Sequence, residues 1–354
     1  MRRAGILGAA GFAGIQLAHT LIHHPEMELA AVASDSLAGT SLAEAYPAFA
    51  GVTDLAFCRS EELEELDLDV VFLAVPHTAS LEQTPRVLER GAVAIDLSAD
   101  FRLKDASTYE AWYGTPHTQV DILADAAFGL PELFPAELVR ARCRREAGQP
   151  VVVACAGCYP TATSLAAAPA IRSGALREGA VVVADAISGV TGAGKKPSAR
   201  THFCFANESL EAYGVTTHRH TPEIEQILGI DGRLVFTPHL APLNRGLLST
   251  VTIPLADGAS IASAEDAHRL YRAFYEGATF VEVLPAGQQP KTSSVVGTDR
   301  AQVGVAFDAR TRCIVATAAI DNLGKGAAGQ AIQCANIVFG MDEGAGLSSV
   351  ALPI

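Results

Sequence analysis

Hydrophobic residues in the first part of the chain recur in short runs, separated by more polar stretches. The runs at residues 4–7, 28–33, 70–75, 93–97 and 151–155 are apolar and rich in β-branched residues, which is typical of buried strands. Residues 12–23 and 80–90 have helical composition. Strands that alternate with helices predict right-handed crossovers and a parallel sheet. We therefore expect an α/β, doubly wound domain over residues 1–156.

The pattern changes after residue 157. Strand-like runs dominate at residues 180–184, 234–237, 248–253, 303–308 and 313–320, with helical stretches near residues 222–228 and 262–276. This pattern predicts a second, mixed α+β domain with a large sheet over residues 157–320. Residues 325–340 again have helical character, and we expect the segment 321–354 to return to the first domain as a helix.

A glycine-rich segment follows the first strand directly and opens the first helix. It has the sequence GAAGFAG, with glycines at Gly8, Gly11 and Gly14. Glycines in this context allow a tight turn and bring backbone amides close to a pyrophosphate at the helix N-terminus. The segment predicts a Rossmann-type dinucleotide site, although its spacing is G-x-x-G-x-x-G rather than G-x-G-x-x-G. A plain strand–helix turn is the alternative.

The residues after the second strand bear on the type of dinucleotide. They are Ser34, Asp35 and Ser36. An acidic side chain at this place can hold the ribose hydroxyls of NAD, whereas a hydroxyl or a cation can accept the extra phosphate of NADP. Asp35 favours NAD and the two serines leave NADP open, so this segment alone does not decide between the cofactors.

Cys158 is the residue that indicates chemistry most directly. It lies in the sequence GCYPT at 157–161, between an apolar run and an alanine-rich stretch. This pattern predicts a strand, a glycine turn and then a helix in which Pro160 is the first residue. A thiol at a helix N-terminus can have its pKa lowered from about 8.5 to roughly 3.5–7.5, which makes it a nucleophile. The alternative is a small buried hydrophobic residue.

A second segment contains histidines that are candidates for acid/base chemistry. His218 and His220 flank Arg219, just before Thr221 as the expected N-cap and Pro222 as the first helical residue. A neutral imidazole with a pKa near 6.5 can deprotonate a thiol or protonate an oxyanion. A further histidine, His77, follows the expected strand at 70–75.

Positive side chains gather beside glycine-rich or polar turns. They are Arg102, Lys195, Arg200, Arg219 and Arg245. In a chain of formal net charge -13, such local cations are what a carboxylate or phosphate substrate requires. The same acidic balance argues against a nucleic-acid or anionic-membrane surface, since both need exposed positive charge.

The seven cysteines, odd in number and irregularly spaced, do not indicate a disulfide scaffold or a zinc site, and they favour a reducing cytoplasm.

Arg2 and Arg3 before an apolar stretch resemble a secretory signal. A strand followed by spaced glycines explains that stretch better. No segment has the roughly 18 uninterrupted apolar residues of a membrane span. We expect a cytoplasmic protein with no metal, nucleic-acid or membrane partner.

Several motifs together resemble the N-acetyl-gamma-glutamyl-phosphate reductase family, the relatives of aspartate-semialdehyde dehydrogenase. The resemblance covers essentially the whole chain and is most specific at residues 157–161 and 218–224. The motifs lie at residues 8–14, 96–103, 129–133, 157–161, 188–194, 218–224 and 319–323.

The resemblance implies a role for individual residues. Cys158 would attack an acyl phosphate, His218 would act as the acid/base, and NADPH would be the donor. The residues expected at the cofactor are Gly8, Gly11, Phe12, Ala13, Gly14, Ser34, Pro76, His77, Ser188, Gly189 and Asn322. The residues expected at the substrate are Ser98, Arg102, Lys195, Arg219 and His220.

The implied reaction is the reductive dephosphorylation of N-acetyl-L-glutamyl 5-phosphate through a cysteine thioester, in arginine biosynthesis, by a homodimer or homotetramer. Alternatives are the same chemistry on aspartyl phosphate or on a carrier-bound aminoadipyl phosphate, and a cofactor-sensing regulator without chemistry. The chain departs from the family pattern at Cys155 and Ala156, where Asn-Pro is usual. This change frees the turn before the nucleophile and makes Cys155 a competing thiol.

Overall fold

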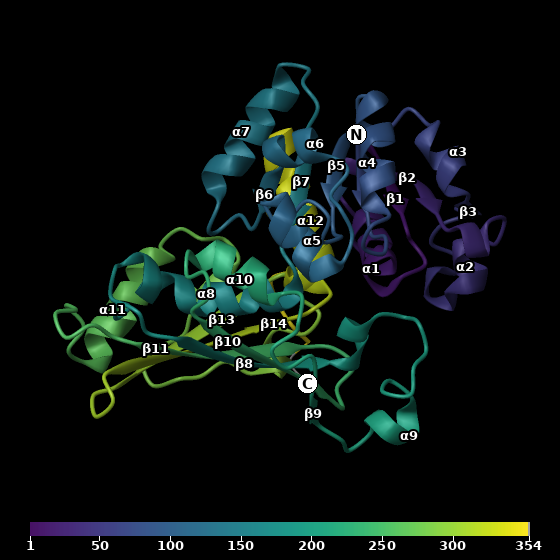
Figure 1. Cartoon of the computed structure of the whole chain (residues 1–354). Helices are drawn as coiled ribbons and strands as arrows, with labels where there is room; N and C mark the ends of the chain where they lie inside the picture. Colours follow the sequence, from purple (N-terminus) through teal and green to yellow (C-terminus); the bar gives the residue numbers. More distant parts are fainter. Residues whose placement is uncertain (353–354) are drawn as a thin grey trace. The chain divides into compact units, whose positions relative to one another are not determined.

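The computed structural model describes residues 1–352 and divides into two compact units (Figure 1). The first unit comprises Met1–Ala156 and Ala327–Leu347. The second comprises Gly157–Gly326 and the described residues from Ser348 onward. The expected segment 321–354 is therefore divided, because residues 321–326 and the described residues after 347 belong to the second unit.

The first unit contains a seven-stranded sheet in the order β3-β2-β1-β4-β5-β7-β6, and every pairing in it is parallel. This confirms the α/β, doubly wound prediction. The order reverses between β1 and β4, which is where open α/β sheets bind ligands at the carboxyl ends of the strands. The strands are β1 Arg2–Leu7, β2 Met27–Ala33, β3 Phe57–Cys58, β4 Val70–Leu73, β5 Val93–Asp96, β6 Ala127–Gly129 and β7 Val152–Cys155.

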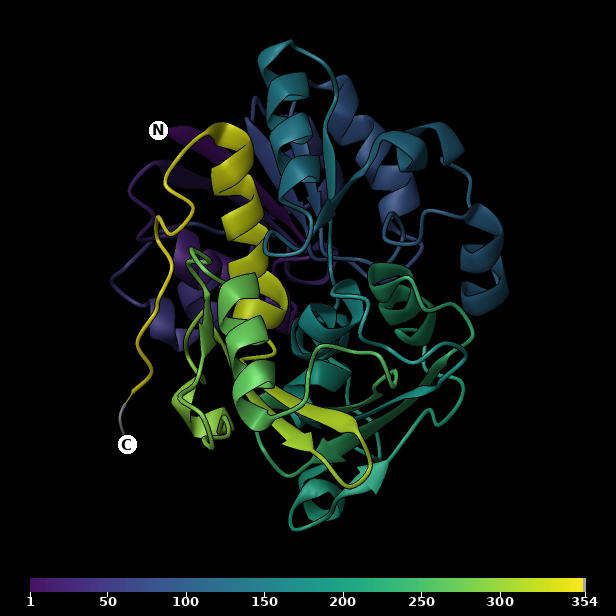
Figure 2. The ribbon, with the colours of Figure 1, turned by 90° about the vertical axis from the view of Figure 1, so that its left-hand side faces the viewer.

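Helices cover both faces of this sheet, and each face has its own hydrophobic core. One core includes Leu17 of α1, Leu138 of α7 and Ile332 of α12; Figure 2 shows α12 in yellow beside the sheet of its unit. The other core includes Leu63 of α3 and Val87 of α4. The helices are α1 Phe12–Leu21, α2 Leu42–Ala45, α3 Ser60–Glu64, α4 Ser80–Glu89, α5 Ala106–Tyr113, α6 Val120–Asp125, α7 Pro135–Glu146 and α12 Gly329–Phe339.

The turn between β1 and α1 requires glycine at two positions. Gly8 has φ +76°, and a Cβ there would lie 2.4 Å from the carbonyl oxygen of Ala74. A Cβ on Gly14 would lie 2.4 Å from the carbonyl oxygen of Gly8. Gly11 is the N-cap of α1. The glycines thus let the first turn of α1 lie directly over the end of β1.

The second unit contains a mixed seven-stranded sheet in the order β12-β13-β14-β11-β8-β10-β9. Its pairs β8–β10 and β12–β13 are parallel and the others are antiparallel. This confirms the prediction of a second, mixed domain with a large sheet. The strands are β8 Val182–Gly189, β9 Glu211–Ala212, β10 Leu234–Ala241, β11 Leu247–Pro254, β12 Val281–Val283, β13 Ala301–Asp308 and β14 Cys313–Ile320.

Helices α8 (Cys158–Arg172), α10 (Thr221–Leu228) and α11 (Ala264–Phe274) lie on one face of this sheet (Figure 1). Residues along β8 alternate accordingly, with Val182 and Ala184 buried and Val183 exposed. Val235 of β10 is exposed as well. Apolar side chains therefore remain uncovered on the other face of the unit. A short helix, α9 (Phe203–Ala206), lies in the connection from β8 to β9.

Two helices begin earlier than the sequence predicts. Helix α8 begins at Cys158, so Pro160 is its third residue rather than its first. Helix α10 begins at Thr221 with His220 as its N-cap, so Pro222 is the second residue. The first-turn N–H groups of a helix have no intrahelical acceptor, which is why proline fits any of these positions and marks the start only approximately.

No helix within residues 1–352 combines the length and the apolar composition that crossing a bilayer requires.

We expect Gly8→Ala to destabilise the fold far more than Gly148→Ala. Gly148 also has a positive φ, of +68°, but open space surrounds it. Its replacement should lower the free energy of unfolding by about 1–2 kcal/mol, the cost of a left-handed residue with a Cβ. Gly8→Ala should add the cost of displacing the Ala74 carbonyl, for a total of about 2–5 kcal/mol. Urea denaturation of both variants measures the difference, and equal losses would contradict this account.

Candidate active site

Cys158 occupies the first position of α8. The preceding residue, Gly157, is the N-cap, with extended dihedral angles of φ −67° and ψ 161°. Cys158 is partly exposed, whereas the next twelve residues of the helix are buried. The first-turn N–H groups and the positive end of the helix dipole stabilise negative charge at this position. The local structure is therefore suited to a thiolate.

Two contacts fix the turn that carries this thiol. The N–H of Gly157 donates a hydrogen bond of 2.8 Å to Oε1 of Glu223, which is almost fully buried on α10. On the other side, a Cβ added to Gly326 would lie 2.8 Å from the Cβ of Cys158. The backbone before Cys158 and the base of its side chain are thus both held by neighbouring elements.

The histidine segment joins an aromatic cluster next to Cys158. The ring centroid of His218 lies 5.6 Å from that of Tyr159, 5.4 Å from that of Tyr213 and 4.9 Å from that of His220. Tyr159 directly follows Cys158 and its hydroxyl accepts a hydrogen bond of 3.2 Å from the hydroxyl of Tyr213. The structure therefore brings both predicted histidines to the residue beside the predicted nucleophile.

The protonation state of His218 follows from its surroundings. Burial, with a smaller contribution from the charge of Arg219, lowers the pKa of His218 to about 4. Its Nδ1 accepts a hydrogen bond of 3.2 Å from the backbone N–H of His220, so the proton of the neutral ring is on Nε2. At neutral pH this side chain is an uncharged hydrogen-bond donor, and its other nitrogen is already occupied.

The neighbouring phenols also stay protonated. Burial raises the pKa of Tyr213 to about 12, with opposing contributions from Tyr159, which lowers it, and Cys158, which raises it. Burial also raises the pKa of Tyr159. Both hydroxyls are thus hydrogen-bond donors at neutral pH.

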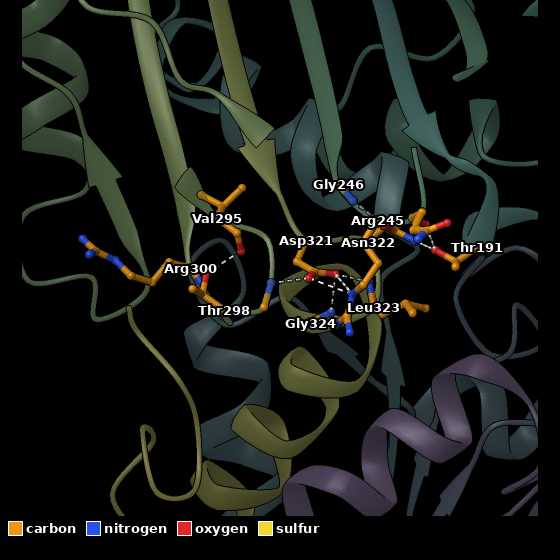
Figure 3. Close-up of polar contacts among 12 residues, drawn as sticks. Thr191, Arg245, Gly246, Val295, Thr298, Arg300, Asp321, Asn322, Leu323 and Gly324 are labelled. Atoms are coloured by element: carbon orange, nitrogen blue, oxygen red, sulfur yellow. Dashed lines mark hydrogen bonds and ion pairs between the residues drawn. The ribbon is translucent and has the colours of Figure 1, made fainter. Parts of the chain in front are cut away.

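Asn322 is held in a turn after β14 by two side-chain contacts (Figure 3). Its Oδ1 accepts the N–H of Gly246 at 2.9 Å, and its Nδ2 donates to Oγ1 of Thr191 at 2.9 Å. Ser188 lies nearby, because a Cβ on Gly192 would lie 2.9 Å from Oγ of Ser188 and 3.9 Å from Nδ2 of Asn322. The structure therefore groups Ser188 and Asn322 within the second unit.

Gly189 continues this group as the last residue of β8. Its N–H donates to the carbonyl of Gly246 at 2.9 Å. A Cβ there would lie 2.8 Å from the carbonyl oxygen of Leu243, so only glycine fits.

Four of the cations that the sequence singles out lie in the second unit. Lys195, Arg200 and Arg219 are exposed, and Arg200 forms an ion pair with Glu211. Arg245 is partly exposed and forms an ion pair with the buried Asp321 at 3.0 Å. Three of these four cations are thus accessible to an anionic substrate.

In the first unit, Asp35 makes contacts that the sequence does not reveal. Its Oδ1 accepts the backbone N–H of Ser60 at 2.9 Å, and its Oδ2 accepts the Ser60 hydroxyl at 3.1 Å. The hydroxyls of Ser34 and Ser36 lie 3.3 Å apart. Both Asp35 oxygens are thus engaged at the first residue of α3.

The loops after β4 and β5 carry the remaining predicted residues. Pro76 and His77 are exposed, and Nδ1 of His77 accepts the N–H of Ala99 at 3.3 Å. Ser98 and Arg102 are buried. The Ser98 hydroxyl donates to Asp96, whose pKa burial raises to about 6, and Arg102 donates to the carbonyl of Leu97 at 2.6 Å.

The two thiols of the C-x-x-C segment differ in access. Cys155 is 1% exposed and packs in the core of the first unit, whereas Cys158 is partly exposed. Burial therefore removes Cys155 as a competing nucleophile. Among residues 1–352, no three or more His, Cys, Asp or Glu side chains are arranged to hold a metal ion.

Sequence reasoning missed several residues that shape this site. Glu223 belongs to the histidine segment, and its place in the first turn of a helix was a usable signal. The sequence carries no such signal for Tyr213 and Gly326, because their contacts join elements far apart in the chain. The missed residues are Tyr159, Thr191, Tyr213, Glu223, Asp321 and Gly326.

Two family models match the chain. The model described as semialdehyde dehydrogenase, NAD binding domain, matches residues 3–141, and the model described as semialdehyde dehydrogenase, dimerisation domain, matches residues 158–322. The N-acetyl-gamma-glutamyl-phosphate reductase of Neisseria gonorrhoeae is 41% identical over 355 residues, which cover 99% of this chain and 98% of the relative. The enzyme of the same name from Pelotomaculum thermopropionicum is 42% identical and is matched over 99% of both chains.

A solved structure, aspartate semialdehyde dehydrogenase with NADP from Candida albicans, is similar with a TM-score of 0.72. The match covers 96% of this chain and 98% of the other at 18% identity. At that identity the likeness bears on the fold alone.

We expect iodoacetamide at pH 7 to alkylate Cys158 about 10-fold faster than the more exposed Cys143 and Cys204, because the helix N-terminus raises the thiolate fraction. Peptide mass spectrometry at timed intervals gives the rate for each cysteine. Cys143 and Cys204 are the internal controls. Equal, slow labelling of all cysteines would contradict an activated thiol and would favour a cofactor-sensing regulator.

Proposed function

Since the chain belongs to the N-acetyl-gamma-glutamyl-phosphate reductase family, we propose that it catalyses the NADPH-dependent reductive dephosphorylation of N-acetyl-L-glutamyl 5-phosphate to N-acetyl-L-glutamate 5-semialdehyde. The protein is an oxidoreductase that acts on an acyl phosphate. The observation that carries the finer proposal is the position of Cys158 at the N-terminus of α8, with His218 packed on the adjacent Tyr159. We assign the reaction to arginine biosynthesis.

Cys158 performs the first step. Its thiolate attacks the acyl carbon, a C–S bond forms, the bond from that carbon to the phosphate oxygen breaks, and inorganic phosphate leaves. The product is a thioester on Cys158. The hydrogen bond from Gly157 to Glu223 keeps the attacking sulfur at the start of the helix during this step.

The second step reduces that thioester. Bound NADPH supplies the hydride for the thioester carbon. Nε2 of His218 donates its proton to the oxygen as negative charge develops there, which gives a hemithioacetal. The hemithioacetal then returns the proton to His218, its C–S bond breaks, and the aldehyde and the Cys158 thiolate are released. A neutral imidazole suits this donor role, since the proton is already on Nε2.

The first unit fits a dinucleotide. Gly8 and Gly14 leave the space over β1 in which a pyrophosphate can approach the first turn of α1. We propose NADPH over NADH because the hydrogen bonds from Ser60 orient the carboxylate of Asp35 toward α3, and the exposed hydroxyl of Ser36 beside it is a polar group for a ribose phosphate. Arg59 is an exposed cation directly after Cys58, whose carbonyl accepts the N–H of Ser34.

We propose that two copies associate through the second unit. Val183 and Val235 expose apolar surface on the face of its sheet opposite α8, α10 and α11, and the matched model for this part of the chain is described as a dimerisation domain.

We also propose a cytoplasmic location, because the seven cysteines of the chain are all thiols in the structure, as a reducing compartment would keep them.

The decisive experiment measures phosphate-dependent oxidation of N-acetylglutamate semialdehyde and of aspartate semialdehyde side by side, with NADP and with NAD. We expect the first aldehyde and NADP to give the higher kcat/KM. Cys158→Ser should abolish turnover because the hydroxyl is a far weaker nucleophile than a thiolate. Higher activity with aspartate semialdehyde would overturn the substrate proposal.

We expect His218→Gln to reduce kcat by about 10²–10⁴-fold, the usual contribution of general acid/base help, while Cys158 still alkylates rapidly.

His218 also makes the free energy of unfolding depend on pH. Its pKa is lowered to about 4 in the folded protein, so the unfolded chain takes up the proton first as the pH falls below 6.5. The free energy of unfolding should therefore fall between pH 6.5 and 4, and fall less in His218→Gln. Identical pH dependence of the two proteins in urea denaturation would contradict this assignment.

A further inference from the structure

Asp321 is a buried carboxylate at the centre of the turn that follows β14 (Figure 3). Its Oδ1 accepts the backbone N–H groups of Leu323 at 2.8 Å and Gly324 at 3.1 Å. Its Oδ2 accepts the N–H of Gly297 at 2.6 Å and lies 3.0 Å from Nε of Arg245. Every group that meets this carboxylate in these contacts is a donor.

The turn organised by Asp321 carries two groups of the proposed active site. Asn322 is the next residue, and its amide contacts Gly246 and Thr191 as described above. Gly326 ends the turn, where its N–H donates to the backbone carbonyl of Asp321 at 2.9 Å and where it packs against the Cβ of Cys158. One carboxylate therefore sets the path of the backbone from the cofactor-binding amide to the nucleophile.

The turn after Asp321 leads into an unusual helical conformation, which agrees with a role of Asp321 in setting the path of the backbone. Residues Gly324–Ala328 form a π-helical segment, a conformation that is rare and is often found at functional sites. Gly324 fits here because a Cβ would lie 2.2 Å from the carbonyl oxygen of Thr298. The unusual backbone thus depends on buried polar contacts as well as on glycine.

We infer that Asp321 is a positioning residue that fixes the amide of Asn322 and the sulfur of Cys158 in one arrangement for hydride transfer. The inference rests on the proposed function, because it assumes that Asn322 meets the nicotinamide cofactor. Asp321 itself touches neither substrate nor cofactor and acts through the turn.

The test compares Asp321→Asn with Asp299→Asn. Both remove one negative charge from a buried carboxyl in the same neighbourhood, but Asp299 accepts the backbone N–H of Ser348 at 2.8 Å, whereas Asp321 accepts the N–H groups of Leu323 and Gly324 in the turn itself. In Asp321→Asn, the new NH₂ group must face an N–H donor in either orientation. We expect the NADPH dissociation constant, measured by fluorescence, to rise about 10-fold or more, as loss of a hydrogen bond to a charged group predicts.

The second readout is alkylation of Cys158 by iodoacetamide. It should slow about 3-fold or more in Asp321→Asn, because stabilisation of the thiolate depends on how the sulfur faces the helix N-terminus. Asn322→Ala should raise the NADPH dissociation constant and leave alkylation unchanged, which separates the two effects. Asp299→Asn should stay close to the wild type in both measurements.

An Asp321→Asn variant that matches Asp299→Asn in both measurements would overturn the inference. If Asp321→Asn does not fold, Arg245→Gln replaces it, since that change loosens the carboxylate and keeps its backbone hydrogen bonds; wild-type values would again overturn the inference. Neither readout uses the acyl substrate, so a wrong substrate assignment leaves the test intact. A wild-type protein that does not bind NADPH would overturn the proposed function and this inference together.

Discussion

The hydrogen bond from the Gly157 N–H to the Glu223 carboxylate is the interaction on which the candidate active site depends. It is buried, and it joins the start of α8 to the first turn of α10. The thiol of Cys158 follows one end of this bond, and the segment that carries His218 precedes the other. The proposed nucleophile and proton donor come from positions about sixty residues apart. This contact, with 2.8 Å between its heavy atoms, and the packing of His218 on Tyr159 bring their segments together.

The electrostatics of the site rely on backbone groups and neutral side chains more than on free cations. His218 is uncharged at neutral pH, and the phenols of Tyr159 and Tyr213 keep their protons. Arg200 and Arg245 are paired with Glu211 and Asp321. In a chain of net charge -13, exposed cations such as Lys195, Arg200 and Arg219 are positions that can attract an anion.

Much of the fold could be predicted from the sequence, because the main strands of the first unit bury both faces and appear as apolar runs. The short strands β3 and β6 could not, since two or three residues carry no periodicity. Helix starts were displaced by one or two residues because proline is tolerated throughout the first turn.

The same contrast holds for the candidate site. Cys158 and His218 could be proposed as catalytic residues from local motifs, which are visible in a linear sequence. The engagement of Asp35 by Ser60, the bond between Gly157 and Glu223, and the contact of Gly326 with Cys158 all join distant segments. Such contacts depend on how the chain folds back on itself, so local patterns of residue type do not reveal them.

The return of α12 to the first unit has a consequence for biosynthesis. Ile332 and its neighbours complete one hydrophobic core of a sheet whose strands all lie within the first 155 residues. During translation, when domains tend to fold in order from the N-terminus, this sheet must therefore wait for nearly the entire polypeptide to leave the ribosome before that face is covered. Until then, the part of this core that α12 covers stays exposed on the nascent chain.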